Sequence, residues 1–221
     1  MKISVEQGIA QAKSSFKRGD FGAAKELYQN ILQTFPHNKR AKRGLAEVLK
    51  NQRKLSQSSI KTEADRLGQM YNKGNFSSVI KKANSIIKNS PKEVSIWEFL
   101  GAAHRGLGNI KEALAAFKTV VELNPNYAAG HNNLGVSFQD LGNYEDSIPC
   151  FTKALSLKSN YAEAHNNLGN SFKDQGNLEK AIAAYEKAIS LKPNYSAAYS
   201  NIGRALHENN NLEKADYALK K

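Results

Sequence analysis

Cysteine is nearly absent from this chain of 221 residues. Cys150 is the only one, so the chain cannot form an internal disulfide or hold a metal through paired cysteines. Free cysteine is among the most buried residue types, and Cys150 lies beside Phe151, so we expect it to pack in the interior of the fold. The fold must therefore be held by packing and hydrogen bonds.

Long apolar stretches are also missing. No stretch approaches the roughly 20 apolar residues that a membrane-spanning helix needs. The first residues, MKISVEQG, lack the apolar core of a secretory signal peptide. We expect a cytoplasmic protein that does not insert into a membrane.

Motifs for catalysis are absent as well. The sequence contains no GxSxG, no HExxH, no paired CxxC and no phosphate-cradling Walker loop. We predict that the chain is not an enzyme, has no catalytic residues and needs no cofactor.

What the chain does contain is a 34-residue repeat. Four sets of similar residues return at this interval: Leu100, Leu134, Leu168, Ile202; Gly101, Gly135, Gly169, Gly203; Asn109, Asn143, Asn177, Asn211; and Phe117, Phe151, Tyr185, Leu219. A unit of this length is a helix pair that cannot bury its apolar face alone, so successive units must stack. The period predicts an all-α solenoid, in which the first glycine of each unit leaves room for the paired helix to approach closely.

The turn residues predict where each helix pair bends. Gly108, Gly142 and Gly176 suit the C-terminal end of a first helix, and the Asn that follows each of them suits the N-cap of a second helix. Pro125 and Pro193 stand where each unit closes, because proline cannot continue a helix.

The unit that begins at residue 94 carries a family pattern: Trp97, Leu100, Gly101, His104, Ala113, Phe117 and Pro125. It resembles the tetratricopeptide repeat, whose pattern is W-x2-L-G-x2-Y, A-x3-F and a closing proline, with His104 in the place of Tyr. The resemblance implies a right-handed superhelical solenoid of antiparallel helix pairs, with the first helices lining a concave face. It also implies a protein-protein interaction scaffold.

The repeat divides the chain. We predict repeats at 94–127, 128–161 and 162–195, an incomplete repeat at 196–221, a degenerate repeat at 60–93 and a first repeat at 5–38. Asp20 and Asn75 occupy equivalent places, but the interval between them exceeds one repeat by 21. The array therefore has a phase break near residues 39–59. This segment could form a helix over about 39–53 followed by a joint at Leu55 to Ser59, or the helix could run on into the next one. We favour the joint.

Positive charge is concentrated in the N-terminal third. Residues 1–93 hold 19 Lys and Arg against seven acidic residues, whereas the rest of the chain is neutral. The densest run lies near one side of a predicted helix and comprises Lys39, Arg40, Lys42, Arg43, Lys50, Arg53 and Lys54. Such a face could bind phosphates or acidic proteins. It lacks the aromatic platform of many nucleic-acid sites, so nucleic acid is the less favoured partner.

An asparagine precedes the signature Leu or Ile in three successive repeats: Asn133, Asn167 and Asn201. The row is similar to the asparagine ladder in the repeat domain of O-linked N-acetylglucosamine transferase, where such amides hold the backbone of an extended polypeptide. An amide offers both donors and an acceptor, so a row of amides can bind a peptide backbone without selecting side chains. We predict that these residues contact a bound peptide.

The neighbouring residues on the first helices are predicted to assist them: Asn132, Asn166, Asn170, Gln139, Lys173 and Arg204. The alternative is that the asparagines only make hydrogen bonds between helices or reflect duplicated repeats. Phe99 takes the ladder position in the preceding repeat, so the row spans three repeats. His131 and His165 are one repeat apart, on helices that pack about 10 Å apart. We therefore predict no metal site.

Three functions follow from these observations. The favoured one is a protein-protein interaction scaffold that holds an extended peptide segment of a partner in the concave groove of the solenoid. The alternatives are the substrate-recruiting N-terminal domain of a larger enzyme (a glycosyltransferase, sulfotransferase or oxygenase) and an anion or nucleic-acid adaptor that uses the basic N-terminal third. The last repeat stops at Lys221, so Leu212, Tyr217 and Leu219 would lack a capping helix. We expect either a fragment of a longer protein or an end through which copies self-associate.

Overall fold

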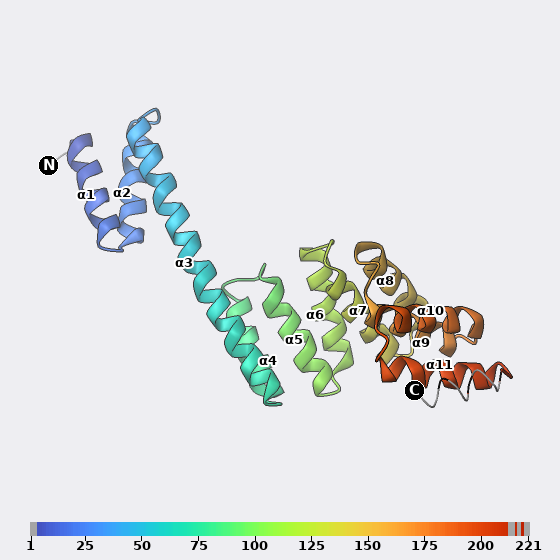
Figure 1. The fold of residues 1–221 in the computed structure, drawn as a ribbon. Helices are drawn as coiled ribbons and strands as arrows, with labels where there is room; N and C mark the ends of the chain where they lie inside the picture. Colours follow the sequence, from blue (N-terminus) through green and yellow to red (C-terminus); the bar gives the residue numbers. More distant parts are fainter. Residues whose placement is uncertain (1–3, 212–214, 216–217, 219–221) are drawn as a thin grey trace. The chain divides into compact units, whose positions relative to one another are not determined.

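The computed structural model describes residues 4–211, 215 and 218, and these residues form eleven α helices (Figure 1). The helices are α1 Val5–Lys17, α2 Phe21–Thr34, α3 Lys39–Asn72, α4 Phe76–Ile87, α5 Val94–Gly106, α6 Ile110–Leu123, α7 Ala128–Asp140, α8 Tyr144–Leu157, α9 Ala162–Asp174, α10 Leu178–Leu191 and α11 Ser196–Glu208. The chain divides into an N-terminal part, Met1–Arg66, and a C-terminal part, Leu67–Lys221.

The C-terminal part is a stack of helix pairs. From α4 to α11, each helix packs against the next one along the chain, and helices farther apart in sequence touch little (Figure 1). The N-terminal part contains the pair α1 and α2, which pack against each other. The predicted all-α solenoid of helix pairs is confirmed.

In each of the regular helix pairs, an aromatic ring of the second helix packs directly against a glycine of the first helix. A Cβ atom added to Gly135 would lie 2.7 Å from the ring of Phe151, and one added to Gly169 would lie 2.6 Å from Tyr185. Both rings are fully buried. The predicted role of the glycine, which is to let the paired helix approach closely, is therefore confirmed.

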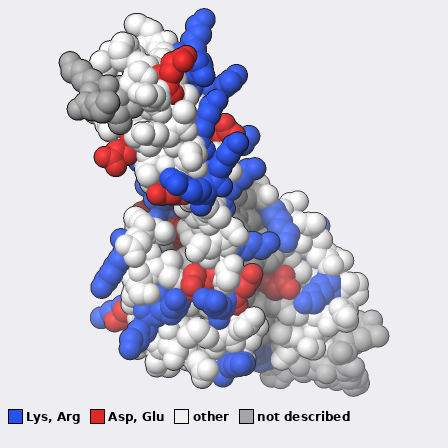
Figure 2. All heavy atoms as spheres, turned by 90° about the vertical axis from the view of Figure 1, so that its left-hand side faces the viewer, with Lys and Arg blue, Asp and Glu red and all other residues white. Residues whose placement is uncertain are grey.

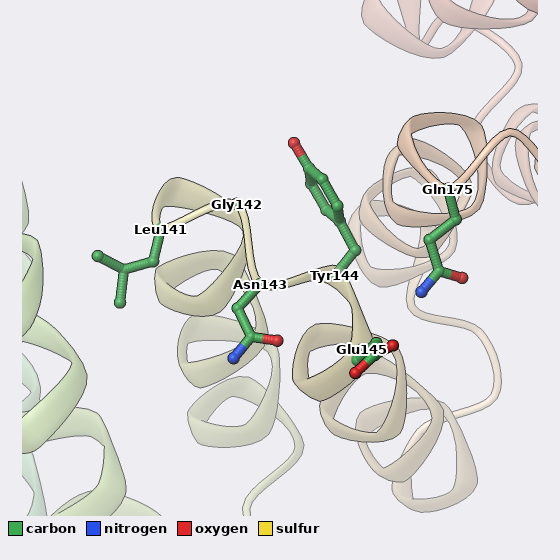
Figure 3. A pocket seen from close by; sticks show the side chains of 6 residues that line it. All are labelled: Leu141, Gly142, Asn143, Tyr144, Glu145 and Gln175. Atoms are coloured by element: carbon green, nitrogen blue, oxygen red, sulfur yellow. The ribbon is translucent and has the colours of Figure 1, made fainter.

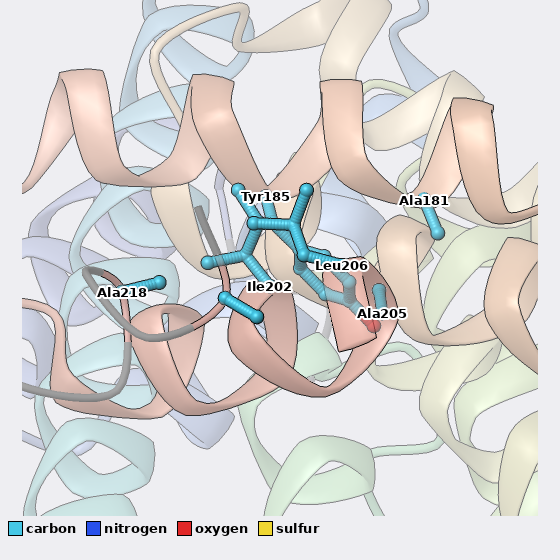
Figure 4. Packing of buried hydrophobic residues seen from close by; sticks show 7 residues of the cluster. Ala181, Tyr185, Ile202, Ala205, Leu206 and Ala218 are labelled. Carbon is cyan, nitrogen blue, oxygen red and sulfur yellow. The ribbon is translucent and has the colours of Figure 1, made fainter. Parts of the chain in front are cut away.

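Small residues complete the interior between successive pairs. Near the C-terminal end, Tyr185 packs with Ile202 and Leu206 of α11 (Figure 4). Ala215 and Ala218 are buried in the same cluster, at 1% and 5% exposure. A core of this kind has no single centre, because each pair buries its apolar face against its neighbours.

The turns within the pairs follow the predicted chemistry. Gly142 has φ +70°, a left-handed conformation that a residue with a side chain rarely adopts. The side chain of Asn143 then caps α8, since its Oδ1 accepts a hydrogen bond from the backbone N–H of Asp146 at 3.1 Å. Asn177 caps α10 in the same way. Asn109 makes no such bond to α6, so the predicted side-chain cap is absent there.

The phase break takes the form of one long helix. Helix α3 runs without interruption from Lys39 to Asn72, so the expected joint at Leu55 to Ser59 was wrong and the alternative of a continuous helix is correct. The segment contains no proline, and Ser56 and Thr62 direct their hydroxyls back to the carbonyls of Gln52 and Ser58, which leaves the helix intact. Leu55 is 56% exposed, so no packing there requires a bend.

Two further expectations concern the ends and the membrane. Leu212, Tyr217 and Leu219, from which an uncapped end was predicted, lie outside the described residues. Within the described part of the chain, no helix is long and apolar enough to span a membrane.

Candidate functional site

The predicted asparagine row forms hydrogen bonds from one repeat to the next. The Nδ2 atom of Asn167 on α9 donates to Oδ1 of Asn132 on α7 at 3.1 Å. The same bond recurs one repeat later, where Nδ2 of Asn201 on α11 donates to Oδ1 of Asn166 at 2.9 Å. The first helices of three repeats are thus linked by amides, as the alternative interpretation of the row expected.

The asparagines of the row and their neighbours on the same helices differ in their access to solvent. Asn132, Asn166 and Asn201 are 6%, 5% and 8% exposed, whereas Asn133 and Asn167 are only partly buried. A primary amide has two N–H donors and an oxygen with two lone pairs. The bond to Asn132 uses one N–H of Asn167, and this leaves its second N–H and its oxygen for a ligand.

Asn133 stands in the same place as Asn167, one repeat earlier. The residue that corresponds to its expected acceptor is Glu98 on α5, which is one repeat before Asn132. Oε1 of Glu98 accepts a hydrogen bond from the Tyr127 hydroxyl at 2.8 Å instead. Burial raises the pKa of Glu98, and the bond from Tyr127 opposes this effect. The amide row therefore ends at a carboxylate.

The residues predicted to assist the row are mostly engaged by neighbours. Nε2 of Gln139 donates to the backbone oxygen of Asn167 at 2.9 Å and to Oγ of Ser171 at 2.8 Å. Oδ1 of Asn170 accepts from the Tyr185 hydroxyl at 2.8 Å. These two side chains therefore stabilise the array. Fewer of their hydrogen-bonding groups remain for a ligand than a free amide would offer.

The two predicted cations differ in their surroundings. Nζ of Lys173 lies 3.2 Å from Oδ1 of Asp174, and the lysine is partly buried. Arg204 is exposed, and its Nη2 donates to Oδ1 of Asn201. Arg204 thus shields the most C-terminal amide of the row and presents its own remaining N–H groups to solvent.

Phe99 does not continue the row, and the structure shows why. Its ring lies 3.4 Å from the position that a Cβ atom on Gly68 of α3 would take, and its centroid is 6.5 Å from that of Tyr71. The ladder position is used here for apolar packing against the end of the long helix. The row is consequently limited to α7, α9 and α11.

His131 and His165, which stand at the position of Trp97 in the repeat and were expected to pack between units, each make a hydrogen bond to the backbone. Nε2 of His131 lies 2.9 Å from the carbonyl oxygen of Pro125, and Nε2 of His165 lies 3.1 Å from that of Ser159. The indole N–H of Trp97 makes the same bond to Pro91. Each bond reaches back to the closing position of the preceding unit, and this backbone acceptor is the part of the role that the sequence did not predict. Among the described residues there is no His, Cys, Asp and Glu group that could hold a metal.

The predicted basic face lies on the N-terminal half of α3, and all seven of its side chains are exposed. Lys50, Arg53 and Lys54 line one open hollow of about 410 Å³. Arg40 and Arg43 line another, of about 360 Å³. In Figure 2, Lys and Arg side chains clearly outnumber Asp and Glu on the face shown.

The second hollow gathers more positive charge than the sequence run suggested. Lys13 and Lys17 of α1 join Arg40 and Arg43 of α3 in its lining, with Glu47 as the acidic member. Arg40 is partly neutralised, because its Nη1 lies 3.3 Å from Oε1 of Glu6. The fold of the N-terminal part brings these cations together, and linear sequence cannot show such a convergence.

A shallow depression of about 470 Å³ lies at the turn between α7 and α8 (Figure 3). Its lining comprises Leu141, Gly142, Asn143, Tyr144, Glu145 and Gln175. The side chain of Asn143 is committed to the helix cap, and the Tyr144 ring extends away from the turn (Figure 3). The depression brings no pair of catalytic groups together, so we assign it no function.

Comparisons with known proteins agree with the fold. A family model described as "TPR repeat" matches residues 101–142, 137–176 and 169–210, and one described as "Tetratricopeptide repeat" matches residues 15–59. No curated protein matches the sequence.

Several solved structures are similar. A crystal structure of MamA is 28% identical, with a TM-score of 0.64, over 72% of this chain and 87% of that one. The thermophilic TPR protein TTC0263 of Thermus thermophilus is 20% identical, with a TM-score of 0.55, over 92% and 100% of the two chains. A tetratricopeptide repeat protein from Parabacteroides merdae is 17% identical, with a TM-score of 0.63, over 98% and 77%. The last two show a likeness of fold alone.

Proposed function

This chain belongs to the tetratricopeptide repeat family, and from that premise we propose that it is a protein-interaction scaffold that holds an extended peptide segment of a partner on the first helices of its C-terminal repeats. The repeats are those at 94–127, 128–161, 162–195 and 196–221. The observation that carries the proposal is the row of amides on α7, α9 and α11, in which Asn133 and Asn167 keep accessible surface.

In this proposal the asparagines have two separate roles. Asn133 and Asn167 contact the peptide backbone, because both are only partly buried and Asn167 keeps a free N–H and its oxygen. Asn132, Asn166 and Asn201 hold the neighbouring helices in register. Gln139 and Asn170 support the helices. Arg204 supplies positive charge beside Asn201, whereas the charge of Lys173 is partly neutralised by Asp174. The protein acts by binding rather than by catalysis, and we place it in the cytoplasm.

The experiment that tests this proposal is retention of a pool of random 12-residue peptides on the immobilised protein. The double variant Asn133→Ala/Asn167→Ala should lose most of the retained peptide. The matched control is Asn126→Ala/Asn160→Ala, which removes two exposed asparagines that also lie one repeat apart. Equal retention by wild type and the Asn133→Ala/Asn167→Ala variant, or no retention by wild type, would contradict the proposal.

A second candidate function is anion binding by the N-terminal part. It is favoured by the hollow that Lys13, Lys17, Arg40 and Arg43 line together. Binding driven by phosphates weakens steeply with salt, whereas binding driven by amide hydrogen bonds changes little. Titration with a single-stranded oligonucleotide at about 50 and about 200 mM salt, with Lys17→Ala/Arg43→Ala as the variant, tests this function separately. Affinity that the variant leaves unchanged would exclude the hollow as the site.

A further inference from the structure

A single carboxylate stands where the next two repeats carry amides. Glu98 on α5 is one repeat before Asn132 and two repeats before Asn166. Those two asparagines each accept a hydrogen bond from an asparagine of the following repeat. By the same register Glu98 corresponds to the acceptor of the bond that Asn133 would donate. The position that holds a neutral amide in those two repeats is thus acidic on α5.

The charge of Glu98 is not neutralised within the described part of the chain. Its Oε1 accepts from the Tyr127 hydroxyl at 2.8 Å, which leaves Oε2 for another donor. None of the ion pairs among the described residues includes it. Arg105, two turns farther along α5, is taken by Asp140 at 3.8 Å. A partly buried carboxylate without a cation is costly, because burial removes the water that stabilises its charge.

Among the residues that the structure describes, no cation lowers the pKa of Glu98. The two titratable groups that face it are the hydroxyls of Tyr127 and Tyr161. Burial raises the pKa of both tyrosines, and the negative charge of Glu98 raises each of them further. The pKa of Glu98 is itself raised, with burial as the main cause. The surroundings therefore stabilise the ionised carboxylate poorly. A cation on a bound ligand would stabilise it and would bind more tightly in return.

We propose that Glu98, together with the Asn133 amide, binds an Arg or Lys side chain of the peptide that the amide row holds. This inference rests on the proposed function. An ammonium group offers three N–H donors and a guanidinium group offers five, so either can bond the free carboxylate oxygen, and a guanidinium can reach the amide oxygen as well. Hydrogen bonds between ionised partners are the stronger kind, and Arg makes them in a fixed geometry. The scaffold accordingly selects extended peptide segments that place one basic residue beside Glu98 when their backbone lies along the amide row.

The test uses three pools of 12-residue peptides that are random except at the sixth position, which is Arg, Gln or Glu. Each pool is passed over immobilised wild-type protein and the retained fraction is measured by mass spectrometry. We expect the Arg pool to be retained about tenfold more than the Gln pool, the scale of a charge-assisted hydrogen bond, and the Glu pool least. Glu98→Gln should abolish the preference for Arg, so that the variant retains the Arg and Gln pools alike.

Two controls separate the possible failures. Glu122→Gln removes an exposed carboxylate at the end of α6 and should keep the preference for Arg. Asn133→Ala/Asn167→Ala should reduce retention of all three pools. If wild type retains the pools equally, or if Glu98→Gln keeps the preference, the basic-residue site is wrong while the peptide surface stands. If wild type retains none of the pools, both proposals are wrong. Circular dichroism of each variant verifies that the helices are intact.

Discussion

The side-chain amide of Asn201 donates a hydrogen bond to that of Asn166 at 2.9 Å, and both residues are more than nine-tenths buried. The bond joins α11 to α9, the first helices of two successive repeats. In a solenoid the contacts between neighbours provide much of the stability, so a buried bond between repeats contributes to the cohesion of the array. The buried asparagines of the row thus have a structural role, whereas Asn133 and Asn167 keep accessible surface.

Replacement of Asn166 by Ala should destabilise the C-terminal repeats. It removes the acceptor of a buried amide, and an unsatisfied buried group costs about 1–3 kcal/mol. The free energy of unfolding, from urea denaturation followed by circular dichroism, measures the loss. Asn160→Ala, which alters an exposed asparagine of the preceding turn, should change the free energy of unfolding by less than about 0.5 kcal/mol. Similar losses in the two variants would show that the bond contributes nothing.

The continuity of α3 gives a second prediction. Ser58 is exposed and lies inside the helix, so Ser58→Pro should cost about 3 kcal/mol by removing a backbone hydrogen bond and by a clash of its ring with the preceding turn. Ser58→Ala should keep the helix and be neutral or slightly stabilising. Helical content by circular dichroism and the denaturation midpoint report both effects. A proline variant with unchanged helicity and midpoint would instead favour a joint in this segment.

The sequence predicted the helix pairs well because their signals are local. Gly142 and Asn143 determine a turn and a cap within a few residues, and the 34-residue period repeats the same signal. The course of α3 was harder to predict. A polar segment without proline is compatible with either a helix or a joint, and no local residue decides between them.

The candidate site likewise has features that the local sequence predicts and features that depend on distant contacts. The row of amides was visible in the sequence, but whether an amide faces solvent or a neighbouring repeat depends on contacts 35 residues away, as between Asn132 and Asn167. The carboxylate of Glu98 was not singled out, because its neighbour Tyr127 lies 29 residues farther along the chain. Repeat alignment could have found it, since Glu98 differs from its equivalents Asn132 and Asn166.

A third prediction concerns pH. Burial raises the pKa of Glu98 in the folded protein above its ordinary value of 4.5. The folded chain therefore takes up this proton at a higher pH than the unfolded chain does. The resulting stabilisation is complete below the ordinary carboxyl range and is lost as the pH rises through the raised pKa. Glu98→Gln has no such proton, so lowering the pH from 7 to 5 should favour the wild type relative to this variant.

The measurement is the free energy of unfolding of both proteins at the two pH values in the same salt. Tyr127 and Tyr161, the titratable groups that face Glu98, stay protonated over this range because burial raises their pKa. Groups elsewhere, such as Glu163, titrate alike in both proteins and cancel in the comparison. If the difference in free energy of unfolding between the two proteins is the same at both pH values, the raised pKa of Glu98 is contradicted.

The contact between Gly135 and Phe151 gives the last prediction. A Cβ atom at residue 135 would lie 2.7 Å from a ring that is fully buried, so Gly135→Ala must displace either the ring or the helix. Overpacking of this kind costs about 1–3 kcal/mol, which exceeds the gain of about 1 kcal/mol that alanine gives over glycine inside a helix. Gly22→Ala on α2 is the matched control, because its Cβ atom would lie 3.7 Å from its nearest neighbour and the residue is exposed. The two substitutions are chemically identical, so their effects on the free energy of unfolding should differ in sign, with Gly135→Ala destabilising and Gly22→Ala neutral or stabilising. If both stabilise the protein, the close approach of the two helices is not what requires glycine at this position.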